Sequence, residues 1–232
     1  MTQDLPGLSA DETDRVARLL EEAATLPPAA YILDDIFERE TERMFRKSWL
    51  PLARVDQVAK PGDFLAMDLL GRPVMIVHGQ DGEIRVMSRT CLHRAAQVAE
   101  GNGNRKLFTC PYHAWSYDTA GQLLRAPLLE GAEDFSEPDC RLPQVRTEIW
   151  QGFILANFDP DAAPFAPQVT TFETYFEKFR LVDMAVVRTL AYASDWNWKV
   201  LVENFMEAYQ HIGVHQETLE HSYHARLPRA RQ

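Results

Sequence analysis

Apolar side chains recur at helical spacing near the start of the chain. Within residues 11–24, and again within about 34–47, they lie three or four positions apart, which places them on one face of an α-helix. Pro27 and Pro28, between these stretches, cannot continue a helix because proline lacks the backbone N–H. The pattern therefore predicts two amphipathic helices, the second capped by Asp34 or Asp35.

From residue 49 to residue 158 the pattern changes to short apolar runs separated by turn residues. The runs with the length and composition of strands are residues 64–70, 74–78, 84–88, 107–110 and 153–158. Asp81 and Gly82 stand between two of them, and this pair favours the tight turn of a β-hairpin because glycine accepts positive φ. The region is predicted to be a small all-β domain.

A proline-rich stretch over residues 159–168 is predicted to connect the β region to a further domain. Residues 185–193 are predicted to form a strand, and a helix is predicted from about Asp195, with Ser194 or Asp195 as its N-cap. The apolar stripe of this helix consists of Trp198, Leu201, Val202, Phe205, Tyr209 and Ile212. We therefore expect an α+β protein with boundaries near residues 47 and 158.

Composition narrows the class of protein. Hydrophobic residues make up 46% and charged residues 25%, which are globular values. The net charge of −10 argues against nucleic acid or an anionic membrane as the main partner, since both are negatively charged. No apolar stretch approaches the ~20 residues that cross a bilayer, and no secretory signal is visible. With only three cysteines, the chain is expected to be cytoplasmic, with free thiols available as metal ligands.

Two short motifs in the predicted β domain each combine a thiol with an imidazole. One residue separates Cys91 from His93, and two separate Cys110 from His113. Zinc accepts such a donor set, but zinc fingers pair Cys with Cys and His with His. Two mixed pairs suit a two-iron cluster better, with both cysteines on one iron and both histidines on the other, as in a Rieske [2Fe–2S] centre. Four unrelated polar residues are the third interpretation.

The motifs Cys91-Leu92-His93-Arg94 and Cys110-Pro111-Tyr112-His113-Ala114-Trp115 resemble those of the Rieske domain in ring-hydroxylating oxygenase α subunits. Asn197-Trp198-Lys199, followed by Glu203-Asn204 and Tyr209, resembles the opening of the catalytic domain in the same family. The resemblance extends from about residue 31 to residue 228. It implies a helical segment at 1–47, a small antiparallel Rieske domain at 48–158, and the incomplete start of an α/β helix-grip catalytic domain at 159–232.

The resemblance also implies which residues surround a cluster. By it, the [2Fe–2S] cluster is held by Cys91, His93, Cys110 and His113. Tyr112 and Trp115 are expected to pack beside the cluster and limit water access, although an ordinary aromatic core explains them equally well. Ala95 stands where many family members have glycine. Cys140 is expected to be a structural or incidental thiol.

A second metal, a mononuclear Fe(II), is implied on the helix around Glu207. Family members have an acidic residue, a His ligand three positions later, a second His five beyond, and a distant carboxylate; these form a 2-His-1-carboxylate site. Here Glu207 and His215 match, but Gln210 occupies the first-His position and His211 follows one residue late. Either His211 reaches the iron through a helix distortion, or Gln210 fills the position and impairs iron binding. Two incidental histidines on a polar helix are the alternative.

The resemblance implies an oxygenase that receives electrons from a reductase or ferredoxin. The cluster would pass them to the mononuclear iron, which with O₂ oxidises a small organic substrate. In the family the full-length subunit forms a homotrimer, and Glu207 would bridge an iron ligand to His113 of a neighbouring copy, with Asn204 in the same catalytic set.

Two rival interpretations follow from the end of the sequence. Few residues follow His215, and none stands where the family has its third iron ligand. We therefore expect the chain to be the N-terminal part of an α subunit, with exposed apolar surface on its last helix. Without a working second iron, it would be an electron-transfer protein or a non-catalytic remnant that binds a cluster.

Overall fold

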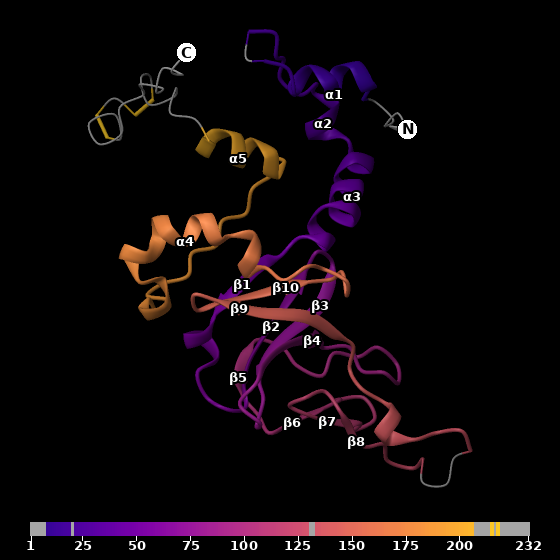
Figure 1. The fold of residues 1–232 in the computed structure, drawn as a ribbon. Coiled ribbons are helices and arrows are strands. Elements are labelled where there is room, and N and C mark those ends of the chain that lie inside the picture. Colours follow the sequence, from indigo (N-terminus) through magenta and orange to yellow (C-terminus); the bar gives the residue numbers. More distant parts are fainter. Residues whose placement is uncertain (1–7, 20, 130–132, 207–213, 216, 219–232) are drawn as a thin grey trace. The chain divides into compact units, whose positions relative to one another are not determined.

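The computed structural model describes residues 8–19, 21–129, 133–206, 214–215 and 217–218 (Figure 1). The chain divides into two compact units, Glu40–Thr189 and Met1–Arg39 with Leu190–Gln232. All strands of the described part lie in the first, which we call the β unit. The second is called the helical unit.

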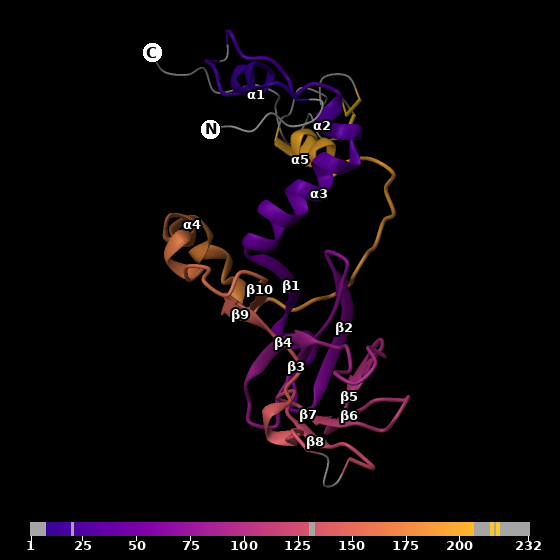
Figure 2. The same cartoon turned by 90° about the vertical axis from the view of Figure 1, so that its right-hand side faces the viewer.

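The β unit contains two antiparallel sheets (Figure 2). The larger has the order β1-β10-β9-β4-β3-β2-β5, and the smaller has the order β6-β7-β8. The larger sheet consists of β1 (Leu50–Arg54), β2 (Asp63–Leu69), β3 (Arg72–His78), β4 (Ile84–Ser88), β5 (Asn102–Asn104), β9 (Gln144–Trp150) and β10 (Phe153–Asn157). The smaller consists of β6 (Leu107–Thr109), β7 (Ser116–Asp118) and β8 (Leu123–Arg125). The predicted antiparallel all-β region is confirmed.

Strand β3 is buried on both faces and lies in the middle of the core. Met75 and Val77 belong to a cluster that includes Phe108 of the smaller sheet, whereas Val74 and Ile76 belong to a second cluster on the opposite face. This division follows from the alternation of side chains along a strand. The two sheets therefore pack against each other through the first cluster.

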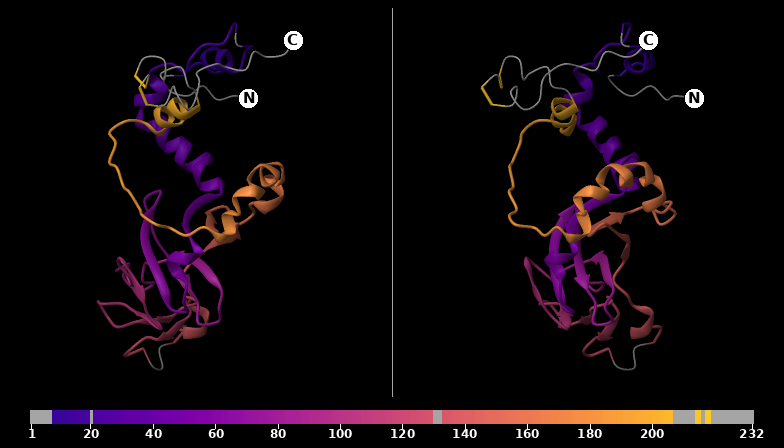
Figure 3. Two further views of the ribbon diagram at one scale, coloured as in Figure 1. Left: turned by 90° about the vertical axis from the view of Figure 1, so that its left-hand side faces the viewer. Right: turned by 60° about the vertical axis from the view of Figure 1, so that its left-hand side comes forward.

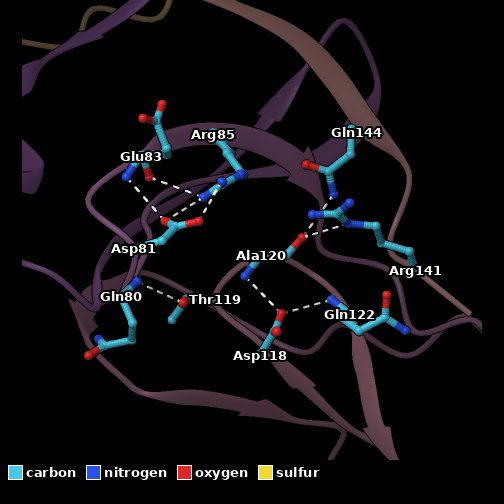
Figure 4. Close-up of polar contacts among 10 residues, drawn as sticks. All are labelled: Gln80, Asp81, Glu83, Arg85, Asp118, Thr119, Ala120, Gln122, Arg141 and Gln144. Carbon is cyan, nitrogen blue, oxygen red and sulfur yellow. Dashed lines mark hydrogen bonds and ion pairs between the residues drawn. The ribbon is translucent and has the colours of Figure 1, made fainter. Parts of the chain in front are cut away.

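Side-chain hydrogen bonds tie the two sheets together at their turns (Figure 4). Asp118 Oδ1 accepts from the backbone N–H groups of Ala120 and Gln122, both at 2.8 Å, which closes the β7–β8 turn. Gln80 N donates to Thr119 Oγ1 at 3.0 Å, which joins this turn to the connection between β3 and β4. The smaller sheet is thus fixed by polar contacts as well as by its buried face.

The predicted hairpin at Asp81 and Gly82 is confirmed, since this pair joins β3 to β4 and Gly82 has φ +86°. Arg85 donates to the Asp81 carboxylate at 2.8 and 2.6 Å. This contact and the Glu83 backbone N–H lower the pKa of Asp81 to about 2.

The helical unit contains short helices. They are α1 (Ala10–Val16), α2 (Ala29–Ile32) and α5 (Trp198–Met206), and the division between the units falls within α3 (Asp34–Arg43). Tyr31 Oη donates to Glu203 Oε1 at 2.8 Å, which connects α2 to α5. Burial and this contact raise the pKa of Tyr31 to about 12. No helix among the described residues is long and apolar enough to cross a bilayer.

Four local predictions were wrong in extent or position. The helix predicted over 11–24 ends at Val16. Its stripe finds little to pack against, since Val16 is 40% and Leu19 77% exposed, and short unsupported helices are marginal. The helix predicted over 34–47 ends at Arg43 and is followed by a 3₁₀ turn, Phe45–Lys47.

The predicted strand at 185–193 is not formed, because the segment has no neighbouring strand to pair with. The N-cap of α5 is Asn197, whose Oδ1 accepts from Lys199 N at 3.1 Å, rather than Ser194 or Asp195. The predicted apolar exposure on this helix is confirmed, since Phe205 is 78% exposed.

Candidate metal centre

The two Cys/His motifs form loops of the same backbone design. In the first, Cys91 N donates to Ala96 O at 2.8 Å and Ala95 N donates to Cys91 O at 3.1 Å. In the second, Cys110 N donates to Trp115 O at 2.8 Å and Ala114 N donates to Cys110 O at 3.0 Å.

The fourth residue after each cysteine has a left-handed conformation, with φ 57° at Ala95 and 59° at Ala114. Glycine adopts this conformation without strain, which explains why glycine suits the position that Ala95 occupies. Each loop therefore returns on itself and closes around its cysteine.

Thiols and imidazoles lie in two layers. Cys91 and Cys110 are each 3% exposed and belong to the core cluster between the sheets. His93 and His113 are exposed, and their ring centroids are 4.5 Å apart. The loops thus place two thiols on the inside and two adjacent imidazoles on the outside. Desolvation and the neighbouring His93 and Arg94 lower the pKa of His113, which favours the neutral ring that can coordinate a metal.

Aromatic side chains enclose the imidazole layer. The Trp115 ring stacks on His93 at 5.1 Å with an interplanar angle of 6°, and the Tyr112 ring lies 3.9 Å from that of His113. Trp115 is 6% exposed, but Tyr112 is 61% exposed. Trp115 therefore shields the inner side of the pair, whereas Tyr112 covers it from the solvent side.

Tyr117 connects the two loops. It lies on β7, directly after the second loop, yet its Oη is 3.3 Å from Cys91 Sγ and accepts from Leu92 N at 3.0 Å in the first loop. Burial, followed by the contact with Cys91, raises the pKa of Tyr117. The hydroxyl therefore stays protonated and can donate to the sulfur. The role of Tyr117 is not among the sequence predictions, although its position two residues after the buried Trp115 marks it as inward-facing.

The donor chemistry fits a two-centre group. Within the part of the chain that the structure describes, no three His, Cys, Asp or Glu side chains gather as for a single metal ion. Cys91 and Cys110 supply buried sulfurs, and His93 and His113 supply adjacent exposed imidazoles, which is the division of donors that a cluster with thiolates on one iron and imidazoles on the other requires. Cys140 lies outside both loops and is half-buried.

The second predicted site is only partly described. Glu207, Gln210 and His211 lie outside the described residues, so the choice between Gln210 and His211 stays a prediction. Asn204 lies on the exposed surface of α5. His215 is described, and its Nδ1 is 3.4 Å from Thr218 Oγ1.

Two segments of the chain match known families. Residues 48–142 match the family described as Rieske [2Fe-2S] domain, and residues 181–231 match the family described as ring hydroxylating alpha subunit (catalytic domain).

Characterised relatives match over most of this chain. It is 35% identical over 210 residues to the alpha subunit of biphenyl 2,3-dioxygenase of Rhodococcus jostii, covering 86% of this chain and 45% of that protein. It is 31% identical to the oxygenase subunit of carnitine monooxygenase of Acinetobacter baumannii, covering 82% of this chain and 52% of that protein. The chain therefore spans about half the length of the relatives it matches.

Solved structures share the fold. The apo form of a quaternary ammonium Rieske monooxygenase has a TM-score of 0.79 at 29% identity, over 84% of this chain and 57% of that one. Naphthalene 1,2-dioxygenase from Rhodococcus has a TM-score of 0.73 at 25% identity, over 84% of this chain and 47% of that one.

Proposed function

Because the chain belongs to the family of Rieske oxygenase α subunits, we propose that it is the electron-accepting part of an O₂-dependent oxygenase. Cys91 and Cys110 hold the inner iron of a [2Fe–2S] cluster, and His93 and His113 hold the outer iron. The observation that carries this proposal is the pair of matching loops with buried thiols and adjacent exposed imidazoles. When bound, such a cluster accepts and releases one electron at a time.

The chain's own residues prepare the site for this chemistry. Water is excluded from the sulfur side of the site, because both cysteines lie in a buried cluster that includes Trp115 and Tyr117. The Tyr117 hydroxyl donates toward Cys91 Sγ, and a hydrogen bond to a ligand sulfur disperses negative charge and favours the reduced cluster. The exposed imidazoles form the side from which an electron can leave.

The second half of the proposal concerns the mononuclear Fe(II). The catalytic-domain match over 181–231 supports a site on the segment with Asn204, Glu207, His211 and His215. Glu207 would accept from an iron-ligand imidazole and from His113 of a second copy, which would fix both tautomers across a trimer interface. A reductase or ferredoxin supplies electrons, the oxidised compound is a small organic molecule, and the three free cysteines fit a reducing cytoplasm.

Metal analysis tests this proposal. The chain is purified without chelators, and iron, zinc and acid-labile sulfide are counted per chain beside the electron paramagnetic resonance spectrum of the reduced protein. Two irons and two sulfides with a Rieske spectrum are expected for the cluster, and a third iron for an assembled oxygenase site. A colourless zinc protein without sulfide would contradict the proposal.

A pure electron-transfer role is the second candidate. Gln210, a weaker iron ligand than imidazole, occupies the first-His position. Two irons per chain, with no third iron bound after Fe(II) is added, would favour this candidate. Restoration of the third iron by Gln210→His would show which residue is responsible.

A further inference from the structure

The segment that matches the catalytic domain begins at residue 181, within the β unit. Here a 3₁₀ turn, Leu181–Asp183, follows α4 (Thr170–Phe176) and a further turn, Glu177–Phe179. Arg54, at the end of β1, reaches this segment from more than a hundred positions away: its Nη2 donates to Leu181 O at 2.6 Å and to Met184 O at 2.7 Å. One guanidinium nitrogen thus binds both ends of the turn.

The guanidinium of Arg54 is itself held in place. The residue is only 8% exposed, its Cζ lies 4.6 Å from the centre of the Phe153 ring, and its Nη1 is 3.4 Å from Gln151 O. Its Nε lies 3.6 Å from Asp56 Oδ1. A buried charge is costly without such partners, so these contacts help to hold the guanidinium where it meets the segment.

Asp56 binds the same segment directly. Its second oxygen, Oδ2, accepts from Val186 N at 2.9 Å. Arg54 and Asp56 therefore hold residues 181–186 at both carbonyl and N–H groups. Charge-assisted hydrogen bonds of this kind are stronger than neutral ones.

Gly152 makes room for this arrangement. A Cβ at this position would lie 2.6 Å from Arg54 Nη2, and Gly152 has φ +82°. Both the space and the backbone conformation therefore require glycine. The β9–β10 turn is shaped around the guanidinium.

Beyond Val186 the chain has no helix or strand until α5 (Figure 3). Val187 is 98% and Tyr192 is 81% exposed. Among the described residues, Val186 is thus the last one of the β unit with a hydrogen bond before the chain passes to the helical unit. The connection, residues 187–197, can span at most ~38 Å.

We propose that Arg54 and Asp56 are positioning residues that fasten the start of the catalytic segment to the cluster-bearing unit, and we call this contact the Arg54 clamp. It sets where the connection to α5 begins, and so how far the proposed iron-binding helix can move from the cluster. The functional part of this inference rests on the proposed function; the clamp itself does not.

The expected consequence can be estimated from chain length. Among the side-chain hydrogen bonds of the described residues, the nearest preceding one to the sheet is at Glu173, whose Oε1 accepts from Trp150 Nε1 at 2.9 Å. Without the clamp, the connection would therefore more than double in length. Effective concentration falls as about the −3/2 power of linker length, so encounters between the joined units would drop up to about threefold.

Amide hydrogen exchange tests the clamp in the intact chain. In Arg54→Met, we expect exchange at Val186 and Met184 to accelerate tenfold or more, while the amides of β3 are unchanged. Gly152→Ala should also accelerate exchange at the Val186 and Met184 amides, because the added Cβ displaces the guanidinium. Arg54→Lys should accelerate exchange less than Arg54→Met does, because it keeps the positive charge. Arg180→Ala is the matched control, because Arg180 is an exposed arginine beside the same segment whose ion pair among the described residues is with nearby Asp183.

A distance measurement tests the positioning role. A nitroxide is attached at Val200→Cys on α5 in a Cys140→Ala background, and its distance distribution to the reduced cluster is recorded. We expect Arg54→Met to broaden this distribution while the cluster spectrum is unchanged.

Unchanged exchange at Val186 in both Arg54→Met and Gly152→Ala would overturn the clamp, and an unchanged distance distribution would overturn its positioning role. Absence of a Rieske spectrum in the unaltered protein would instead contradict the proposed function and would leave the exchange result to decide on the clamp.

Discussion

The two cluster loops and helix α5 differ in what supports their functional side chains. Each loop is closed by its own backbone hydrogen bonds and anchored by a cysteine that is 3% exposed. On α5, by contrast, Leu201 is 49% and Phe205 is 78% exposed, and Asn204 lies on the surface. The two loops are thus supported entirely within the β unit, whereas α5 presents a face that nothing in the described structure covers.

Removing one thiol should have the largest effect. We expect Cys110→Ala to abolish the [2Fe–2S] chromophore, because a three-ligand set leaves one iron open. Cys140→Ala, which removes a cysteine outside the loops, should retain the visible spectrum and two irons per chain. Equal loss of iron in both variants would show that Cys140 takes part in the site.

The second largest effect should be the difference in stability between two truncations to alanine, one in the core of the β unit and one on α5. Met75→Ala, at a position with 0% exposure, is expected to cost about 2–5 kcal/mol in the free energy of unfolding, because it leaves a cavity in the core. Phe205→Ala should change it by about 0.5 kcal/mol or less. Urea denaturation measures both, and a large loss in Phe205→Ala would mean that α5 is covered.

The Tyr117 hydroxyl provides a smaller and more specific effect. Tyr117→Phe removes the contact with Cys91 Sγ but keeps the ring. A net hydrogen-bond contribution of ~1 kcal/mol corresponds to a fall in the cluster's reduction potential on the order of 40 mV for one electron. Spectroelectrochemical titration measures this fall. Tyr112→Phe is the control, because its exposed ring makes no sulfur contact among the described residues.

Acid titration should give the smallest effect. Arg85 lowers the pKa of Asp81 to about 2, below its unfolded value, so this pair stabilises the protein above about pH 4. The contribution is lost as the pH falls through the folded pKa. Asp81→Asn should therefore be slightly less stable than the parent at neutral pH and should approach the parent's stability below about pH 2. The difference is small because the Asp81 side chain is 51% exposed.

Local sequence signals predicted the parts of the molecule that local physics determines. Four of the five predicted strands differ from the observed ones by one residue or less at each end or coincide with them, since apolar runs and turn residues act over a few positions. The two Cys/His motifs were recognisable because their donors are close in sequence. Asp81 and Gly82 formed the expected turn for the same reason.

The contacts that the sequence did not reveal all join distant positions. Tyr117 reaches back to Cys91, and Arg54 reaches forward to Leu181 and Met184. The residues next to Arg54 in the sequence do not indicate its partners. The space for its guanidinium is made by the turn at Gly152, which is distant in the sequence. The strand predicted at 185–193 failed in the opposite way, since its local pattern was suitable but no neighbouring strand was present.

The double-sided burial of β3 has a consequence for how iron would be lost. The first loop follows β4, which pairs with β3, and both cysteines share the core cluster that β3 lines. The exposed imidazoles leave the outer iron open to a chelator, but the sulfur side is reached only after this core opens, so loss of the inner iron should keep pace with global unfolding. The slow loss of absorbance in a chelating buffer would then measure how often the β unit unfolds completely.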